Sequence, residues 1–171
     1  VSAAWLRGPS LRQLIAVLSR VDHPVAVSFG DKSNPLASST AISGLVELLS
    51  SVPGTSVFRT DHHAGLEAVA RSGGSFSFGL LPSARRVTPP GSRGMAQNKR
   101  DKRPHVIVPS LHRIVRSTML SDWFVNSLPE RCTTQGCDGR RLDAYDGTDA
   151  QRQDAHIHNL RYVAGVWRDL T

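Results

Sequence analysis

The sequence has few of the residues and segments that define several common classes of protein. It contains two cysteines, Cys132 and Cys137, in 171 residues, whereas a secreted domain stabilised by disulfides usually contains more. We therefore expect a reducing, cytoplasmic setting. No apolar run is long enough to cross a bilayer, and the first residues lack the charged start and apolar centre of a signal peptide. Hydrophobic residues make up 39% of the chain, which is enough to form a core.

The sequence also lacks the short motifs of several large enzyme classes. It contains no G-x-x-x-x-G-K-[ST] string and no G-x-G-x-x-G string, the two patterns whose backbone amides bind nucleotide phosphates. It contains no serine nucleophile elbow. These absences argue against a P-loop nucleotidase, a Rossmann dehydrogenase and an α/β-hydrolase.

Positive charge is concentrated in one part of the sequence. The net charge is +7, and the segment 85–116 alone carries +8, so that the remainder is −1. Basic charge gathered in this way favours a polyanionic partner, most simply tRNA or DNA, although a solvated segment with no partner has the same composition. The candidate nucleic-acid-binding residues are Arg85, Arg86, Arg93, Lys99, Arg100, Lys102 and Arg103.

Periodic apolar residues and turn residues predict alternating helices and strands in the first half of the chain. Two of the predicted helices follow possible N-caps at Ser10 and Asp61, and a third covers Ser38 to Ser50. The predicted strands cover 25–29, 56–59 and 75–81. This alternation indicates an α/β fold with parallel βαβ units, resembling either the late part of a (β/α)₈ barrel or a small three-layer sheet. We assign these units to 1–88.

The second half divides into a linker and a smaller subdomain. Tandem prolines, glycines and cations predict a basic linker or loop at 89–105. We predict a helical Cys/His subdomain over 106–171, in which 106–108 is a strand or the entry to a helix. A helix is expected from about Ser110, and a final helix from about Ala150 to Leu170. The apolar residues expected on the inner face of the final helix are Ile157, Leu160, Ala164 and Trp167.

Two cysteines and two histidines make up a candidate metal site near the end of the chain. Two nearby thiolates and an imidazole are ligands that Zn²⁺ prefers. His156 and His158 lie two apart on a predicted helix and so point in different directions, and only one of them is expected to bind. The open alternatives are that the cysteines are ordinary buried thiols or form a disulfide.

This segment resembles the zinc-binding region of tRNA-guanine transglycosylases. That family has a C-x-C-x-x-C motif followed by a histidine at the start of an H-N-L helix. Cys132 and Cys137 match its first and third cysteines, and His158 stands in the string IHNL, but Thr134 takes the place of the middle cysteine. The resemblance covers about forty residues, together with a looser match of the βα units to late barrel strands. It implies Zn²⁺ held by Cys132, Cys137 and His158, with His156, Asp138, water or nothing in the fourth position.

The family's catalytic aspartate is missing from its expected place. It precedes a V-L-P-T-R-like string on a late strand, and the corresponding position here is Phe78, before Gly79. Asp31 and Asp61 each follow a predicted parallel strand, where active sites of α/β folds lie. They are our candidate catalytic residues. The alternative is that Asp61 only caps a helix and Asp31 only forms a turn.

Three functions are consistent with the sequence. The resemblance implies exchange of guanine for a 7-deazaguanine in tRNA or DNA, in which a partner chain is one source of the rest of the barrel. A second possibility is a non-catalytic, nucleic-acid-binding subunit related to that family. A third is a structural component of a larger assembly, using the segment 85–116 as an extended arm.

Overall fold

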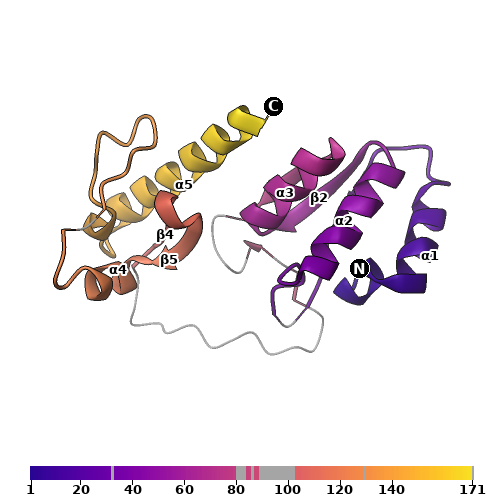
Figure 1. The fold of residues 1–171 in the computed structure, drawn as a ribbon, viewed down its shortest axis with the longest axis horizontal. Coiled ribbons are helices and arrows are strands. Elements are labelled where there is room, and N and C mark those ends of the chain that lie inside the picture. The colour runs from indigo at the N-terminus through magenta and orange to yellow at the C-terminus, as the bar shows by residue number, and fades with distance from the viewer. Residues whose placement is uncertain (32, 80–83, 86, 89–102, 129, 171) are drawn as a thin grey trace. The chain divides into compact units, whose positions relative to one another are not determined.

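The chain forms two compact units, which a computed structural model describes over residues 1–31, 33–79, 84–85, 87–88, 103–128 and 130–170. The units are Val1–Met95 and Ala96–Thr171 (Figure 1). Their boundary falls inside the segment 89–105 that the sequence sets apart as a linker. Among the described residues, no helix combines the length and apolarity needed to cross a membrane.

The N-terminal unit is built on a parallel sheet. Its strands are β1 (Val25–Val27), β2 (Thr55–Thr60) and β3 (Ser75–Phe78), in the order β1-β2-β3. Both pairings are parallel, with Val27 opposite Val57 and Val57 opposite Phe76. The helical elements are η1 (Ala3–Leu6), α1 (Gly8–Leu18), α2 (Ser39–Ser51) and α3 (His62–Ser72). The predicted parallel βαβ units are therefore confirmed, and the described strands form a three-stranded sheet and not a full barrel.

Local sequence signals set most of the helix boundaries in this unit. The Ser38 hydroxyl accepts the Ala41 N–H at 3.2 Å and begins α2, and the Asp61 carboxylate accepts the His63 N–H at 3.0 Å and begins α3. Gly73 ends α3 in the left-handed conformation, with φ of 68°. The predicted cap at Ser10 is wrong, because α1 begins at Gly8 with Pro9 in its first turn.

The N-terminal core lies between the helices and one face of the sheet. Its largest fully buried side chains are those of Leu6, Leu45, Leu48 and Val57. Gly44 is in contact with η1, since a Cβ on it would lie 2.0 Å from the Leu6 carbonyl oxygen. Only glycine permits the two helical segments to pack this closely.

The C-terminal unit contains a β-hairpin that the sequence analysis did not predict. Strand β4 (His105–Val108) pairs antiparallel with β5 (Arg113–Arg116), and the connection is the 3-10 helix η3 (Pro109–Leu111) followed by His112 at φ of 47°. The helix predicted from about Ser110 is wrong, and the subdomain is not purely helical. A helix begins only at α4 (Ser117–Trp123), which precedes the 3-10 helix η4 (Leu142–Ala144) and α5 (Asp149–Leu170).

Helix α5 packs along β4 (Figure 1), but not through the face that the sequence predicts. Ile157 and Leu160 are 36% and 47% exposed, whereas His158 and Asn159 are 1% and 0% exposed. The predicted inner face is therefore wrong. The polar pair can be buried because each side chain is bonded to the backbone of β4. The buried residues of α5 are Ala155, His158, Asn159, Tyr162 and Val163.

Candidate metal centre

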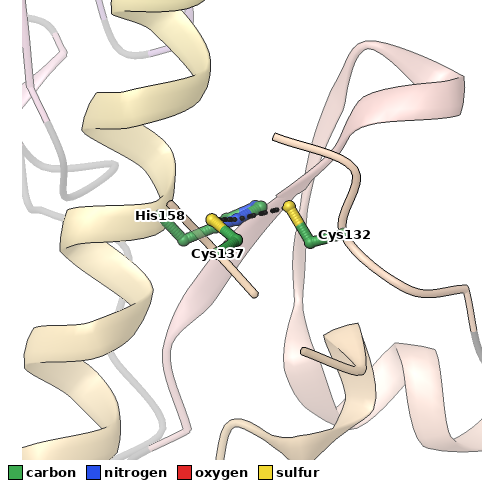
Figure 2. A group of neighbouring side chains, drawn as sticks. All are labelled: Cys132, Cys137 and His158. Carbon is green, nitrogen blue, oxygen red and sulfur yellow. Dashed lines mark hydrogen bonds between the residues drawn. The ribbon is translucent and has the colours of Figure 1, made fainter. Parts of the chain in front are cut away.

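Cys132, Cys137 and His158 converge in the C-terminal unit, and one ligand atom from each lies within 4.8 Å of the others. The two cysteines come from the loop before η4, and the histidine comes from the middle of α5 (Figure 2). His158 Nδ1 lies 3.2 Å from Cys132 Sγ and 3.3 Å from Cys137 Sγ. These are the three ligands that the resemblance indicates, and the fold brings them together across 26 residues.

The hydrogen bond made by His158 Nε2 determines the protonation of Nδ1, the ring nitrogen that faces the two sulfurs. Nε2 lies 2.7 Å from the Ile107 carbonyl oxygen. A carbonyl only accepts, so Nε2 carries the proton and Nδ1 presents its lone pair toward the two sulfurs. Histidine ligands of metals are commonly held in this way, with the other ring N–H bonded to a carbonyl or carboxylate. Burial lowers the pKa of His158, which favours the neutral ring that a metal requires.

The loop 132–140, which contains both cysteines and is called the cysteine loop below, is closed by backbone hydrogen bonds between its own residues. Cys132 N–H donates to the Arg140 carbonyl at 2.9 Å, and Arg140 N–H donates to the Cys137 carbonyl at 3.0 Å. Thr134 N–H points at Cys132 Sγ at 3.3 Å. Tight turns at Gly136, Asp138 and Gly139, all with positive φ, permit the chain to fold back. The loop thus holds both sulfurs without help from a disulfide, since both cysteines are free thiols.

The separations suit a tetrahedral metal. Zinc–sulfur bonds of about 2.3 Å and zinc–nitrogen bonds of about 2.0 Å place sulfur and nitrogen about 3.5 Å apart. The observed separations of 3.2 and 3.3 Å are within a few tenths of that value. Burial, together with the neighbouring Cys132, raises the pKa of Cys137 to about 11, so that without a metal the Cys137 thiol is protonated. The nearby Arg161 acts in the opposite direction.

The other ligand candidates are not part of this group. Among the described residues, neither His156 nor Asp138 contributes a ligand atom to the cluster. The site is surrounded by residues that the sequence analysis did not single out. Tyr145 packs with its ring centroid 5.9 Å from that of His158, and Arg140 lies over the Tyr145 ring. Arg161, three residues after His158, shares its side of α5 and could have been recognised from helical spacing.

The two candidate catalytic aspartates bond to separate partners in the N-terminal unit. Asp31 accepts the Ser33 N–H at 3.3 Å, as a turn residue does. Asp61 caps α3 and lies 3.8 Å from His62 Nδ1. His62 is 1% exposed, and neither of its ring nitrogens has a hydrogen-bond partner among the described residues. Phe78, which the sequence resemblance aligns with the family's aspartate, has its ring centroid 6.4 Å from that of this histidine.

The predicted nucleic-acid-binding residues fall largely outside the described residues. Arg86, Arg93, Lys99, Arg100 and Lys102 do so, and Arg85 and Arg103 are described. Arg85 is 9% exposed, and its Nε donates to the Gly79 carbonyl at 2.8 Å. Burial lowers the pKa of Arg85, and Asp61 opposes that shift. Its guanidinium therefore acts inside the N-terminal unit.

Comparison of the chain with protein-family models, with curated proteins and with solved structures finds no match. The function is therefore inferred from the geometry of Cys132, Cys137 and His158.

Proposed function

We propose that Cys132, Cys137 and His158 bind one Zn²⁺, which crosslinks the cysteine loop to α5. The observation that carries this proposal is the orientation of His158. Its Nε2 is bonded to the Ile107 carbonyl, so that its Nδ1 lies 3.2 and 3.3 Å from the two sulfurs. Two thiolates and one imidazole form a borderline-soft donor set, which suits zinc better than calcium or magnesium.

The chain's own residues prepare this site before a metal arrives. The carbonyl of Ile107 fixes the histidine tautomer, and the Thr134 N–H points at Cys132 Sγ. The guanidinium of Arg161 favours negative charge on Cys137. Bound zinc would supply a rigid link between segments that are 26 residues apart in sequence.

The test is the zinc content of the full chain, measured by elemental mass spectrometry, with cobalt substitution as a second readout. About one zinc per chain is expected, with cobalt absorption bands typical of tetrahedral thiolate coordination. Cys132→Ser, Cys137→Ser and His158→Gln should each lose the metal. His156→Gln is the matched control, because it removes an imidazole from the same helix outside the cluster. Equal zinc in His156→Gln and His158→Gln would refute the assignment.

For the protein as a whole, we propose the activity of the family that the segment resembles, which is exchange of guanine for a 7-deazaguanine in tRNA or DNA. The resemblance supports this, as does the convergence of the residues matched to its zinc ligands. Asp61 or Asp31, or a partner chain, would have to supply the nucleophile. Incubation with labelled guanine and either nucleic acid tests the activity, and Asp61→Asn and Asp31→Asn identify the nucleophile. Absence of exchange with every substrate, with and without a natural partner, would contradict it.

The second candidate is a non-catalytic nucleic-acid-binding subunit. Two observations favour it: Asp61 is engaged as the cap of α3, and the resemblance aligns Phe78 with the family's aspartate. Basic residues of the segment 85–116 other than the buried Arg85 would contact phosphates. Binding of tRNA or DNA should then weaken steeply as salt rises, because each neutralised phosphate releases counterions. Binding that does not change with salt would exclude this function.

A further inference from the structure

A pocket borders the candidate metal centre on one side. Its volume is about 470 Å³, within the range of small-molecule sites. Cys137 and His158 line it, and Cys132 does not. The pocket therefore opens beside the metal position, on the side away from Cys132. A zinc site with only three protein ligands is usually an open site, with a position accessible to a further ligand.

Three arginines from three different places line the same pocket. Arg131 precedes the first cysteine, Arg140 ends the cysteine loop, and Arg161 extends from α5. Arg131 donates one bond to the Gly139 carbonyl at 3.0 Å, and Arg161 donates one to the Gly136 carbonyl. A guanidinium has five N–H donors, so both arginines retain donors for a ligand.

The acidic residues of the lining only partly offset this charge. Asp154 is paired with Arg140 at 2.5 Å, and Asp138 is the second carboxylate in the lining. Three guanidiniums against two carboxylates leave the lining positive by one charge. The zinc site itself would add none, because two thiolates balance the charge of Zn²⁺.

The position of Arg161 depends on the glycine that faces it. Gly136 has φ of 79°, and a Cβ on it would lie 3.2 Å from the Arg161 Cζ atom. The missing side chain leaves room for the guanidinium to lie directly against the loop. This places a planar cation at the wall of the pocket, where a bidentate contact can form.

We propose that this pocket binds the phosphate group of a nucleotide, either free or at the end of a nucleic acid strand. Guanidinium groups recognise phosphate oxygens through paired, charge-assisted hydrogen bonds, and the pocket volume accommodates a nucleotide rather than an inorganic ion alone. The inference rests on the proposed zinc site, because the metal would hold the loop that carries Arg131 and Arg140.

The test uses the zinc-loaded full chain and isothermal titration calorimetry. Guanosine 5′-monophosphate is compared with guanosine, and a 5′-phosphorylated oligonucleotide with the same strand lacking the phosphate. The monophosphate should bind and the nucleoside should not. Arg161→Gln and Arg131→Gln should each weaken binding about tenfold or more. Arg168→Gln is the matched control, since it removes an arginine from the same helix outside the pocket, and it should change nothing.

Zinc is measured on every variant, which separates this inference from the proposed metal site. A chain that binds no zinc yet distinguishes monophosphate from nucleoside keeps the phosphate pocket and refutes the metal. A zinc-loaded chain that binds both equally overturns the pocket. Equal effects of Arg131→Gln and Arg168→Gln on binding of the monophosphate also overturn it. If Arg161→Gln loses its zinc, the comparison of Arg131→Gln with Arg168→Gln alone tests the pocket. Preference for the phosphorylated strand over the free monophosphate identifies nucleic acid as the source of the phosphate.

Discussion

The side chain of Asn159 accepts the backbone N–H of Ile107 at 2.8 Å. The preceding residue on α5, His158, donates to the carbonyl of the same Ile107 at 2.7 Å. Two consecutive side chains thus bond both polar groups of one residue on the edge of β4 that faces away from β5. Asn159 also donates to the His105 carbonyl at 2.9 Å. Side chains of α5 therefore satisfy backbone groups of β4 that a further strand would otherwise bond at this edge of the sheet.

Replacing Asn159 by alanine should destabilise the C-terminal unit strongly. Asn159 is fully buried, and its loss would leave the buried Ile107 N–H without its acceptor and would remove the hydrogen bond that the His105 carbonyl accepts from Asn159. Each buried polar group left unsatisfied costs about 1–3 kcal/mol, so we expect a loss of about 3 kcal/mol in the free energy of unfolding. Urea denaturation measures it.

The matched control is the next residue on the helix. Leu160 is 47% exposed, and Leu160→Ala should cost less than about 1 kcal/mol, although leucine is the more hydrophobic of the two residues. A larger loss for Leu160→Ala than for Asn159→Ala would mean that the inner face of α5 is the apolar one after all.

The contact between Asn159 and β4 also shows why some elements could be predicted from the sequence and others could not. Ser38, Asp61 and Gly73 act within a few residues of their own positions, so their roles as helix ends could be read directly. The burial of Asn159 depends on β4, more than fifty residues away. An amphipathic pattern counts polar residues as exposed, and it therefore assigns Leu160 to the core and Asn159 to the surface.

The β4–β5 hairpin was not predicted, because its turn also depends on a residue distant in sequence. Leu111, Ile114 and Val115 fit a helical repeat, which predicted a helix from Ser110. The turn is made by His112 in the left-handed conformation, and its Nδ1 bonds to the Tyr162 hydroxyl of α5. A non-glycine residue in that conformation is not expected from local sequence. The grouping of Cys132, Cys137 and His158, by contrast, could be predicted, because the resemblance to the family's motif singles out these three residues.

Removal of zinc should loosen the C-terminal unit selectively. A ligand that binds only the folded state stabilises it by mass action, and here it would join the cysteine loop to α5. We expect a chelator to lower the melting temperature of this unit and to speed hydrogen exchange at 132–140 and in β4. Exchange in β2 and α3 of the N-terminal unit should not change. Mass spectrometry of the exchanged peptides distinguishes the two regions, and uniform acceleration would argue against a local metal.

Restoring a cysteine at position 134 tests the resemblance itself. The resemblance aligns Thr134 with the middle cysteine of the family's motif, and the Thr134 N–H points at Cys132 Sγ at 3.3 Å. Thr134→Cys should supply a fourth ligand and tighten zinc binding by at least about tenfold. Competition with a chromophoric chelator measures the affinity. Thr133→Cys is the control, because it adds a thiol one residue away without matching the motif. Equal gains for both substitutions would show that the alignment with the family is wrong.

The N-terminal unit should lose stability in mild acid because of His62. Its ring is buried, and that burial, with smaller contributions from His63 and Arg85, lowers the pKa of His62 to about 4. In the unfolded chain the pKa is near 6.5. Between these values the unfolded state binds the proton and the folded state does not, so lowering the pH favours unfolding.

The stabilisation should be complete above about pH 6.5 and lost progressively down to about pH 4, a difference on the order of 3 kcal/mol. Urea denaturation of the N-terminal unit across this range measures it. His62→Leu has no group to titrate and leaves no ring nitrogen unbonded, so its stability should vary less with pH. His63→Gln should keep most of the dependence, because His63 is exposed. If His62→Leu loses as much stability between pH 7 and pH 4 as the unaltered chain, the buried imidazole is not the acid-sensitive group.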